Sequence, residues 1–158
     1  MDPSEIIEIL GLKIIKNSIG VKDKLKFQIL FELKENLKEN LGVEFIYIHS
    51  PTNEKRDEKL DVYEIPTNRV GKFKVTFLVT PPKIFLKGVP SIFGITLLLI
   101  QFKYKYFEFT RVGYYVNNDL NGPIEKDSNS NIFFKTQFTE RNILINEPRV
   151  TKFFCSFI

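Results

Sequence analysis

The stretch Ser91–Phe102 reads SIFGITLLLIQF and is apolar on both sides of an extended chain. In a strand Leu97 and Leu99 point to one face, and Leu98 and Ile100 point to the other. A continuous apolar run is typical of a parallel sheet buried under helices, but no series of long amphipathic helices alternates with strands here. The run therefore favours an antiparallel all-β fold. One face of this strand would pack on the core, and the other would need cover from the same chain or from a partner.

Other segments alternate apolar and polar residues, as half-buried strands do. Residues 25–33 and 71–80 show this alternation most clearly. Four further strands are expected at residues 6–15, 43–50, 107–117 and 149–158, with a bend at Gly11 and a turn near Lys105. We predict an all-β fold, an immunoglobulin-like β-sandwich of seven to nine antiparallel strands with short helical segments in loops. A closed barrel is the alternative.

The segments between these strands are polar. Residues 51–61 hold four acids and three bases, which predicts a solvated loop or a short turn of helix. Connections are also expected at residues 34–42 and 83–90. Residues 120–131 form the loop in which we most expect disorder, and residues 132–138 are ambiguous.

Composition limits the class of protein. A chain of 158 residues that is 43% hydrophobic can bury one core, so we expect a single domain over residues 1–158. The net charge of +4 comes from 23 basic and 19 acidic residues spread along the chain, which permits nucleic-acid binding without indicating it. A single cysteine, Cys155, favours a reducing intracellular compartment. No apolar run approaches the roughly 20 residues of a membrane span.

Enzyme chemistry is not expected. His49 is the only histidine, so a catalytic triad has one candidate base, and a histidine at a strand end is more simply a structural residue. One histidine and one cysteine cannot supply the four ligands of a structural zinc site. The isolated glycines form no phosphate-binding loop. We predict neither a cofactor nor a metal.

Two blocks of sequence carry a family resemblance. Residues 108–119 (EFTRVGYYVNND) and 141–153 (RNILINEPRVTKF) resemble two signature blocks of the anti-silencing-function histone chaperones. Phe27–Leu33, the region of Tyr47, Leu60 with Asp61, and Gly94–Leu97 resemble further segments of that family at compatible spacing. The resemblance covers nearly the whole chain, apart from its start and the region from 120 to 138.

The resemblance implies a non-enzymatic, immunoglobulin-like protein of the nucleus, with a cytoplasmic pool, that acts as a monomer. It implies binding of the histone H3–H4 heterodimer, which would block tetramer formation. The bound histones would be handed to deposition factors during nucleosome assembly and disassembly. Neither membrane binding nor direct nucleic-acid binding is expected.

The same resemblance assigns histone-contact positions. Ile95, Leu97 and Leu99 match positions that receive an H3 helix, which would explain the second apolar face. Arg149–Thr151 match an edge to which the C-terminal segment of H4 adds as a strand, and Tyr114 belongs with that edge. Taken singly, such residues have plainer interpretations as core or solvated positions. The full set is Ile48, Asp57, Ile95, Thr96, Leu97, Leu99, Arg111, Tyr114, Tyr115, Arg149, Val150 and Thr151.

A second site is implied for deposition factors that carry basic hairpin segments. Its matching residues are Phe31, Glu39, Asn40, Leu41 and Val75. The family usually has two acids where this chain has Glu39 and Asn40, so we expect weakened binding of a basic hairpin. The family also usually has an acid where this chain has Ser91.

Two alternatives remain. The first is an immunoglobulin-like module that recognises nuclear peptides or modified histone tails. It would need an aromatic cage, and the adjacent pair Tyr114 and Tyr115 already lies within the chaperone block. The second is a basic nucleic-acid-binding sandwich. A pull-down with H3–H4, with and without competing DNA, would separate the three hypotheses.

Overall fold

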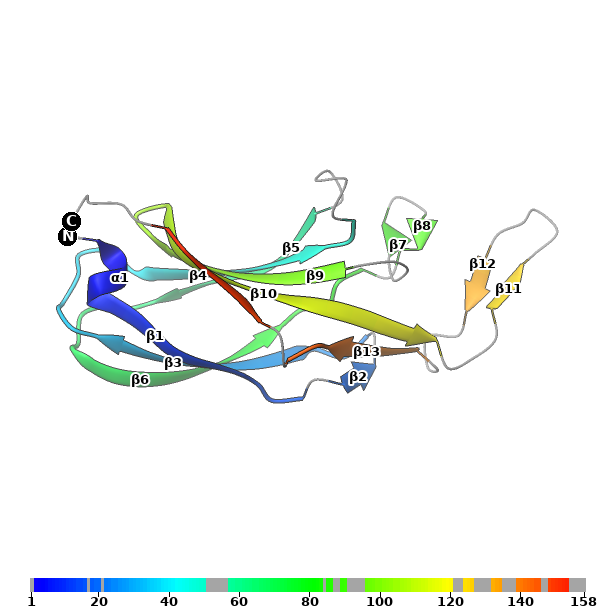
Figure 1. Cartoon of the computed structure of the whole chain (residues 1–158), viewed down its shortest axis with the longest axis horizontal. Coiled ribbons are helices and arrows are strands. Elements are labelled where there is room, and N and C mark those ends of the chain that lie inside the picture. Colours follow the sequence, from blue (N-terminus) through cyan, green and yellow to red (C-terminus); the bar gives the residue numbers. More distant parts are fainter. Residues whose placement is uncertain are drawn as a thin grey trace.

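The computed structural model describes residues 2–16, 18–20, 22–50, 57–83, 85–86, 89–90, 96–120, 124–126, 132–134, 139–145 and 148–153. Within these ranges the chain forms two stacked β-sheets and one short helix, α1 (Pro3–Ile6) (Figure 1). Asp2 caps this helix, because its carboxylate accepts a hydrogen bond of 2.8 Å from the backbone N–H of Ser4. The all-β prediction is confirmed.

The smaller sheet has three antiparallel strands in the order β1-β3-β6. Their bounds are β1 (Ile7–Ile14), β3 (Leu25–Leu33) and β6 (Gly71–Val79). The expected bend at Gly11 is present as a shift in the β1–β3 register between Ile9 and Gly11.

The larger sheet has seven strands. In order across the sheet they are β2 (Ser18–Gly20), β13 (Thr139–Ile143), β10 (Phe107–Leu120), β9 (Thr96–Tyr104), β4 (Leu41–Ile48) and β5 (Asp57–Ile65). The seventh, β14 (Arg149–Lys152), pairs with the first half of β10. Two short hairpins lie outside these sheets: β7 (Phe85–Leu86) with β8 (Val89–Pro90), and β11 (Ile124–Lys126) with β12 (Ile132–Phe134).

The core lies between the two sheets. Phe27 of β3 packs against Phe45 of β4 with ring centroids 5.2 Å apart, and both side chains are fully buried. Leu98 and Ile100 of β9 are also fully buried, whereas Leu97 and Leu99 are only partly buried. The apolar run therefore has one face in the core and one face outside it, as its alternation predicts.

Residues 57–61 were expected to lie in a loop or helical turn, and that prediction was wrong, because they begin strand β5. Among the described strands β5 pairs only with β4, at the edge of its sheet, so its charged side chains can point to solvent. Two of its side chains also close this side of the sandwich. The Asp61 carboxylate accepts a 2.6 Å hydrogen bond from Thr80 N, and the Tyr63 hydroxyl donates to Leu78 O.

Other boundaries also differ. The described residues contain fourteen strands rather than seven to nine, because several are only two to five residues long. β11 falls within the expected loop at 120–131, and β13 was not predicted. The turn near Lys105 is confirmed, and both Lys105 (φ 50°) and Tyr106 (φ 66°) adopt left-handed conformations.

Some expectations fall on residues that the structure does not describe. Ser91, Ile95 and Cys155 are among them, as are residues 135–138 and the end of the last predicted strand. No helix in the described ranges is long and apolar enough to cross a membrane. The same ranges contain no cluster of three or more side chains able to hold a metal ion.

Candidate protein interface

An apolar strip crosses the outer face of the larger sheet. Its first row pairs Ile48 of β4 with Leu97 of β9, and Leu97 with Tyr115 of β10. Its second row places Ile46 opposite Leu99. Tyr115 is 44% exposed and the four aliphatic side chains are partly buried. Apolar side chains left partly open in two adjacent rows are suited to contact with another protein.

Gly113 shapes the second row. It lies opposite Leu99, and a Cβ atom at this position would be 3.1 Å from Leu99 Cδ2. Because Gly113 has no side chain, the Leu99 side chain can pack over the backbone of β10 at this position. A larger residue would push Leu99 away and make the strip uneven.

Charged groups border the strip. Arg111 of β10 donates two hydrogen bonds to Glu108, with Nε–Oε1 at 2.6 Å and Nη2–Oε2 at 2.8 Å. The hydrogen bonds that Arg111 donates to Glu108 raise the pKa of Arg111, whose guanidinium also lies 5.5 Å from the centre of the Phe153 ring. Lys103, which lies opposite Glu108, contacts Glu44 at 2.9 Å at the same end of the strip. These contacts hold Arg111 in one orientation before any partner binds.

The edge strand β14 offers backbone groups to a partner. Phe153 N donates to Phe109 O at 2.9 Å, so the N–H groups of residues 149, 151 and 153 point toward β10. The N–H groups of Val150 and Lys152 therefore point outward. In the described part of the chain β14 pairs with no strand except β10. An extended peptide could add here as a further strand.

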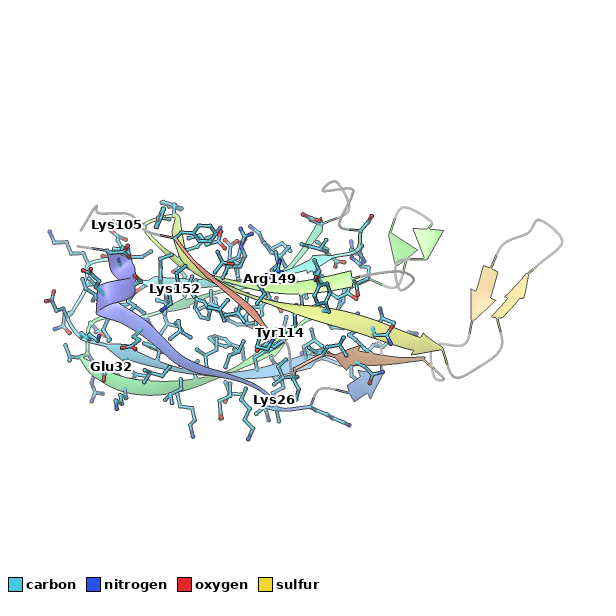
Figure 2. The ribbon with its side chains drawn as sticks, viewed as in Figure 1. Lys26, Glu32, Lys105, Tyr114, Arg149 and Lys152 are labelled. Atoms are coloured by element: carbon cyan, nitrogen blue, oxygen red, sulfur yellow. The ribbon has the colours of Figure 1, made fainter. Side chains whose placement is uncertain are left out.

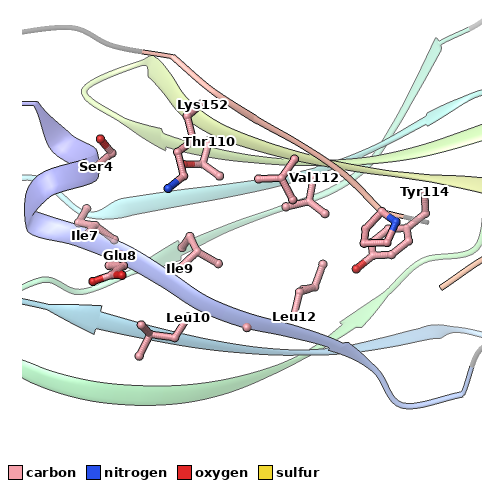
Figure 3. Close-up of a pocket in the computed structure, with 13 residues that line it drawn as sticks. Ser4, Ile7, Glu8, Ile9, Leu10, Leu12, Thr110, Val112, Tyr114 and Lys152 are labelled. Atoms are coloured by element: carbon pink, nitrogen blue, oxygen red, sulfur yellow. The ribbon is translucent and has the colours of Figure 1, made fainter. Parts of the chain in front are cut away.

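A cavity of about 250 Å³ lies next to this edge, between β14 and β1. Figure 3 shows Leu12, Val112 and Tyr114 around it. Tyr114 is 4% exposed, and burial raises the pKa of its hydroxyl. The cavity is large enough to hold an apolar side chain. Val150 and Tyr114 were predicted to lie at this edge, whereas the β1 side of the cavity was not predicted, because only the fold brings Leu10 and Leu12 to it.

Thr96 does not share a face with Leu97 and Leu99. Its side chain is fully buried, and its Oγ1 donates to Val116 O at 2.7 Å and accepts from the Tyr47 hydroxyl at 2.8 Å. The structure corrects the grouping of Thr96 with the histone-contact residues, since its even-numbered position points into the sandwich. Arg141 lies on the same inner side with its guanidinium 5.2 Å from the Tyr47 ring, and burial lowers the pKa of Arg141.

The residues predicted to bind deposition factors lie only partly in one place. Phe31 and Val75 line a groove at one end of the smaller sheet, together with Ile65 and Phe73. Leu41 is fully buried in the core and does not line this groove, which corrects the sequence-based grouping. The charged residues in the lining are two bases that the sequence analysis missed, Arg69 and Lys74.

Glu39 and Asn40 lie beside a different hollow. Asn40 Nδ2 donates to Glu64 Oε2 at 3.3 Å, and this hollow also contains Lys103. The backbone of Glu39 is nevertheless tied to the loop that borders the groove, because Thr67 Oγ1 donates to Glu39 O at 2.6 Å. The predicted acidic position thus adjoins the groove without lining it.

Comparisons with known proteins give a consistent family. A family model described as ASF1 like histone chaperone matches residues 4–158. Histone chaperone ASF1 of Saccharomyces cerevisiae is 35% identical over 150 residues, which cover 94% of this chain and 53% of that protein. Histone chaperone cia1 of Schizosaccharomyces pombe is also 35% identical, over 94% of this chain and 58% of its own length. Histone chaperone asf1 of Drosophila melanogaster is 33% identical, over 93% and 67%. This chain thus spans between half and about two thirds of these relatives.

Proposed function

The chain belongs to the ASF1-like family of histone chaperones, and from this premise we propose that it binds the histone H3–H4 heterodimer in the nucleus. Members of this family are binding proteins without enzymatic activity, in agreement with the prediction that the chain is not an enzyme. We further propose that residues 1–158 act as one domain and as a monomer. A cytoplasmic pool of the protein remains a prediction.

The observation that carries this proposal is the apolar strip of Ile46, Ile48, Leu97, Leu99 and Tyr115. Three adjacent strands span about 10 Å, which matches the diameter of a helix. An amphipathic H3 helix would lay its apolar side on Leu97 and Leu99. Asp57 lies opposite Ile48 at the β5 border and provides a carboxylate for a basic histone residue. The oriented guanidinium of Arg111 provides a donor on the opposite border.

The edge strand supports a second histone contact. We propose that an extended C-terminal segment of H4 pairs with the outward backbone groups of Val150 and Lys152. Side chains of such a strand alternate, so every second one could enter the cavity beside Tyr114. Arg149 and Thr151 would then stay in register with β10 and hold the edge in place. This arrangement combines backbone pairing for affinity with one side-chain site for register.

Binding in this way would cover the H3 surface that pairs two H3–H4 dimers. We propose that the chaperone thereby blocks tetramer formation and delivers single dimers for nucleosome assembly and disassembly. Light scattering after size exclusion should give the mass of one chaperone, one H3 and one H4. A complex with the mass of a histone tetramer and two chaperones would contradict the blocking function.

The module that reads modified histone tails is less well supported. Such a module needs an aromatic cage, but Tyr114 is buried on the inner face whereas Tyr115 is exposed on the outer face. Two adjacent strand residues point to opposite sides and cannot enclose one methylated side chain. Equal binding of modified and unmodified histone dimer is therefore expected.

We also propose that the groove at Phe31 and Val75 receives a hairpin of a deposition factor. Its apolar lining of Ile65 and Phe73 supports this interaction. A basic hairpin would meet the two bases of the lining, with Glu39 as the nearby acid. We therefore expect contact mainly through apolar side chains and lower affinity than a groove with two acids would give.

A further inference from the structure

A group of exposed lysines lies on one surface of the molecule. The side of the smaller sheet that faces away from the core carries exposed Lys13, Lys26, Lys72 and Lys74. Three more exposed lysines lie on the segments that adjoin the Lys26 end of this sheet, Lys16, Lys22 and Lys24. We call these seven residues the lysine face. Figure 2 shows Lys26 on this side of the sandwich.

The charge on this surface is not balanced by neighbouring acids. Among the described residues of this surface, Asp23 and Glu32 are the two acids that form no ion pair with a lysine. The third acid, Glu8, is 3.2 Å from Lys34 and is neutralised by it. Seven positive and two negative charges leave a balance of +5. The whole chain carries +4, so the remainder of the molecule is close to neutral at −1. The composition suggested an even spread of charge, whereas the fold gathers the excess on one face.

The lysines of this face are also available to a ligand. None of the seven makes an ion pair with another described residue. Most outward positions between them hold uncharged side chains, among them Gln28, Leu30 and Thr76, and the one acid beside a lysine of β6 is Glu32, which lies opposite Lys72. Several ammonium groups without an ion-pair partner among the described residues create a positive potential that attracts a polyanion.

We propose that the lysine face binds the phosphate backbone of double-stranded DNA without reading its sequence. Lysine is a point charge that contacts phosphate. The described outward strand positions hold no arginine and one amide side chain, Gln28, which is too little to recognise a sequence of base edges. No aromatic side chain lies at these positions either, which disfavours single strands because their binding uses base stacking. The three strands are about 10 Å across, enough for contacts with several phosphates.

This DNA contact is independent of the proposed histone sites. The lysine face lies on β1, β3, β6 and the segments that adjoin them, whereas the apolar strip lies on the outer face of the other sheet. The two surfaces are separated by the core of the sandwich, as Figure 1 shows for the two sheets. One molecule could therefore hold a histone dimer and touch DNA at the same time.

Fluorescence anisotropy with a labelled 20-base-pair duplex tests this inference. Contact with four phosphates predicts a plot of log affinity against log salt with a slope of about −3.6, or roughly a hundredfold loss between 50 and 200 mM salt. The variant Lys13→Glu/Lys26→Glu should reduce the magnitude of this slope by about 2 and weaken DNA binding about tenfold or more at 50 mM salt.

The matched control is Lys38→Glu/Lys105→Glu, which makes the same change in net charge at two exposed lysines elsewhere. It should retain most of the DNA affinity, and both variants should melt and bind H3–H4 like the wild type. Equal loss in the two variants would overturn the proposal, because it would show an effect of net charge alone. No binding of the duplex at 50 mM salt would also overturn it. Tighter binding of poly-glutamate than of the duplex would instead identify a site for acidic proteins.

Discussion

Replacement of Leu97 by arginine tests the apolar strip at its centre. Leu97 lies between Ile48 and Tyr115, and it is partly buried before any partner binds. In a complex the new guanidinium would be desolvated among apolar side chains without a carboxylate partner. Loss of a central contact costs about 2 kcal/mol or more, and a buried unpaired charge adds to that. We expect the affinity for H3–H4 to fall at least about 30-fold.

The fold should tolerate the same change. The aliphatic part of arginine can cover the neighbours of Leu97 while its charge stays in water. We expect a change of less than about 1 kcal/mol in unfolding free energy, or about 2 to 4 °C in melting temperature. Leu98→Ala is the control on the opposite face of β9. Leu98 is fully buried, so its truncation should cost about 2 to 5 kcal/mol.

Isothermal titration with H3–H4 and thermal melting of both variants separate binding from stability. If the strip is the interface, Leu97→Arg should lose histone binding and keep its fold. Leu98→Ala should lose stability, and its folded fraction should still bind histones. If Leu97→Arg destabilises the fold as strongly as Leu98→Ala, Leu97 belongs to the core. If it binds histones with unchanged affinity, the strip is not the H3 site.

Three further substitutions test other parts of the account. Val150→Pro removes an outward backbone donor of β14, whereas the control Val150→Ala keeps it. In calorimetry the proline variant should bind an H4 C-terminal peptide about 1 kcal/mol more weakly than the alanine variant, and equal affinities would refute strand addition. Thr96→Val removes the hydroxyl that links Tyr47 to Val116. It should lower the free energy of urea unfolding by about 1 to 3 kcal/mol without changing histone affinity, and an unchanged unfolding midpoint would contradict the role of these hydrogen bonds in the core. Arg69→Glu should strengthen the binding of a basic hairpin peptide by about 0.2 to 1 kcal/mol at low salt. Equal binding by the wild type and the variant would show that Arg69 does not contact the peptide in that groove.

The alternation of apolar residues predicted the strands that are buried on one face. β3 and β6 follow from it directly, because the side-chain period of a strand is two residues. β5 was missed because its stability does not come from its own apolar pattern. It is an edge strand. Its Tyr63 hydrogen-bonds to the backbone of Leu78 in β6 and its Asp61 to the backbone of Thr80 just after β6, and sequence periodicity contains no signal for such contacts.

The candidate site was predictable where position along one strand determines the facing side. The parity of Leu97 and Leu99 placed them outside the core, in agreement with the structure. Parity also places Thr96 inside, and the resemblance overrode that signal. Leu41 and Arg69 show the remaining limit. Whether a residue lines a groove depends on how the two sheets stack, which no local pattern specifies.

Amide hydrogen exchange of the protein, free and bound to H3–H4, tests the central claim most directly. The account predicts slower exchange at the outward N–H groups of Val150 and Lys152, where the H4 strand would pair. It predicts little change at Lys72 and Lys74, which lie on the sheet away from the histone surface. New protection on β6 with none on β14 would contradict the proposed mode of histone binding.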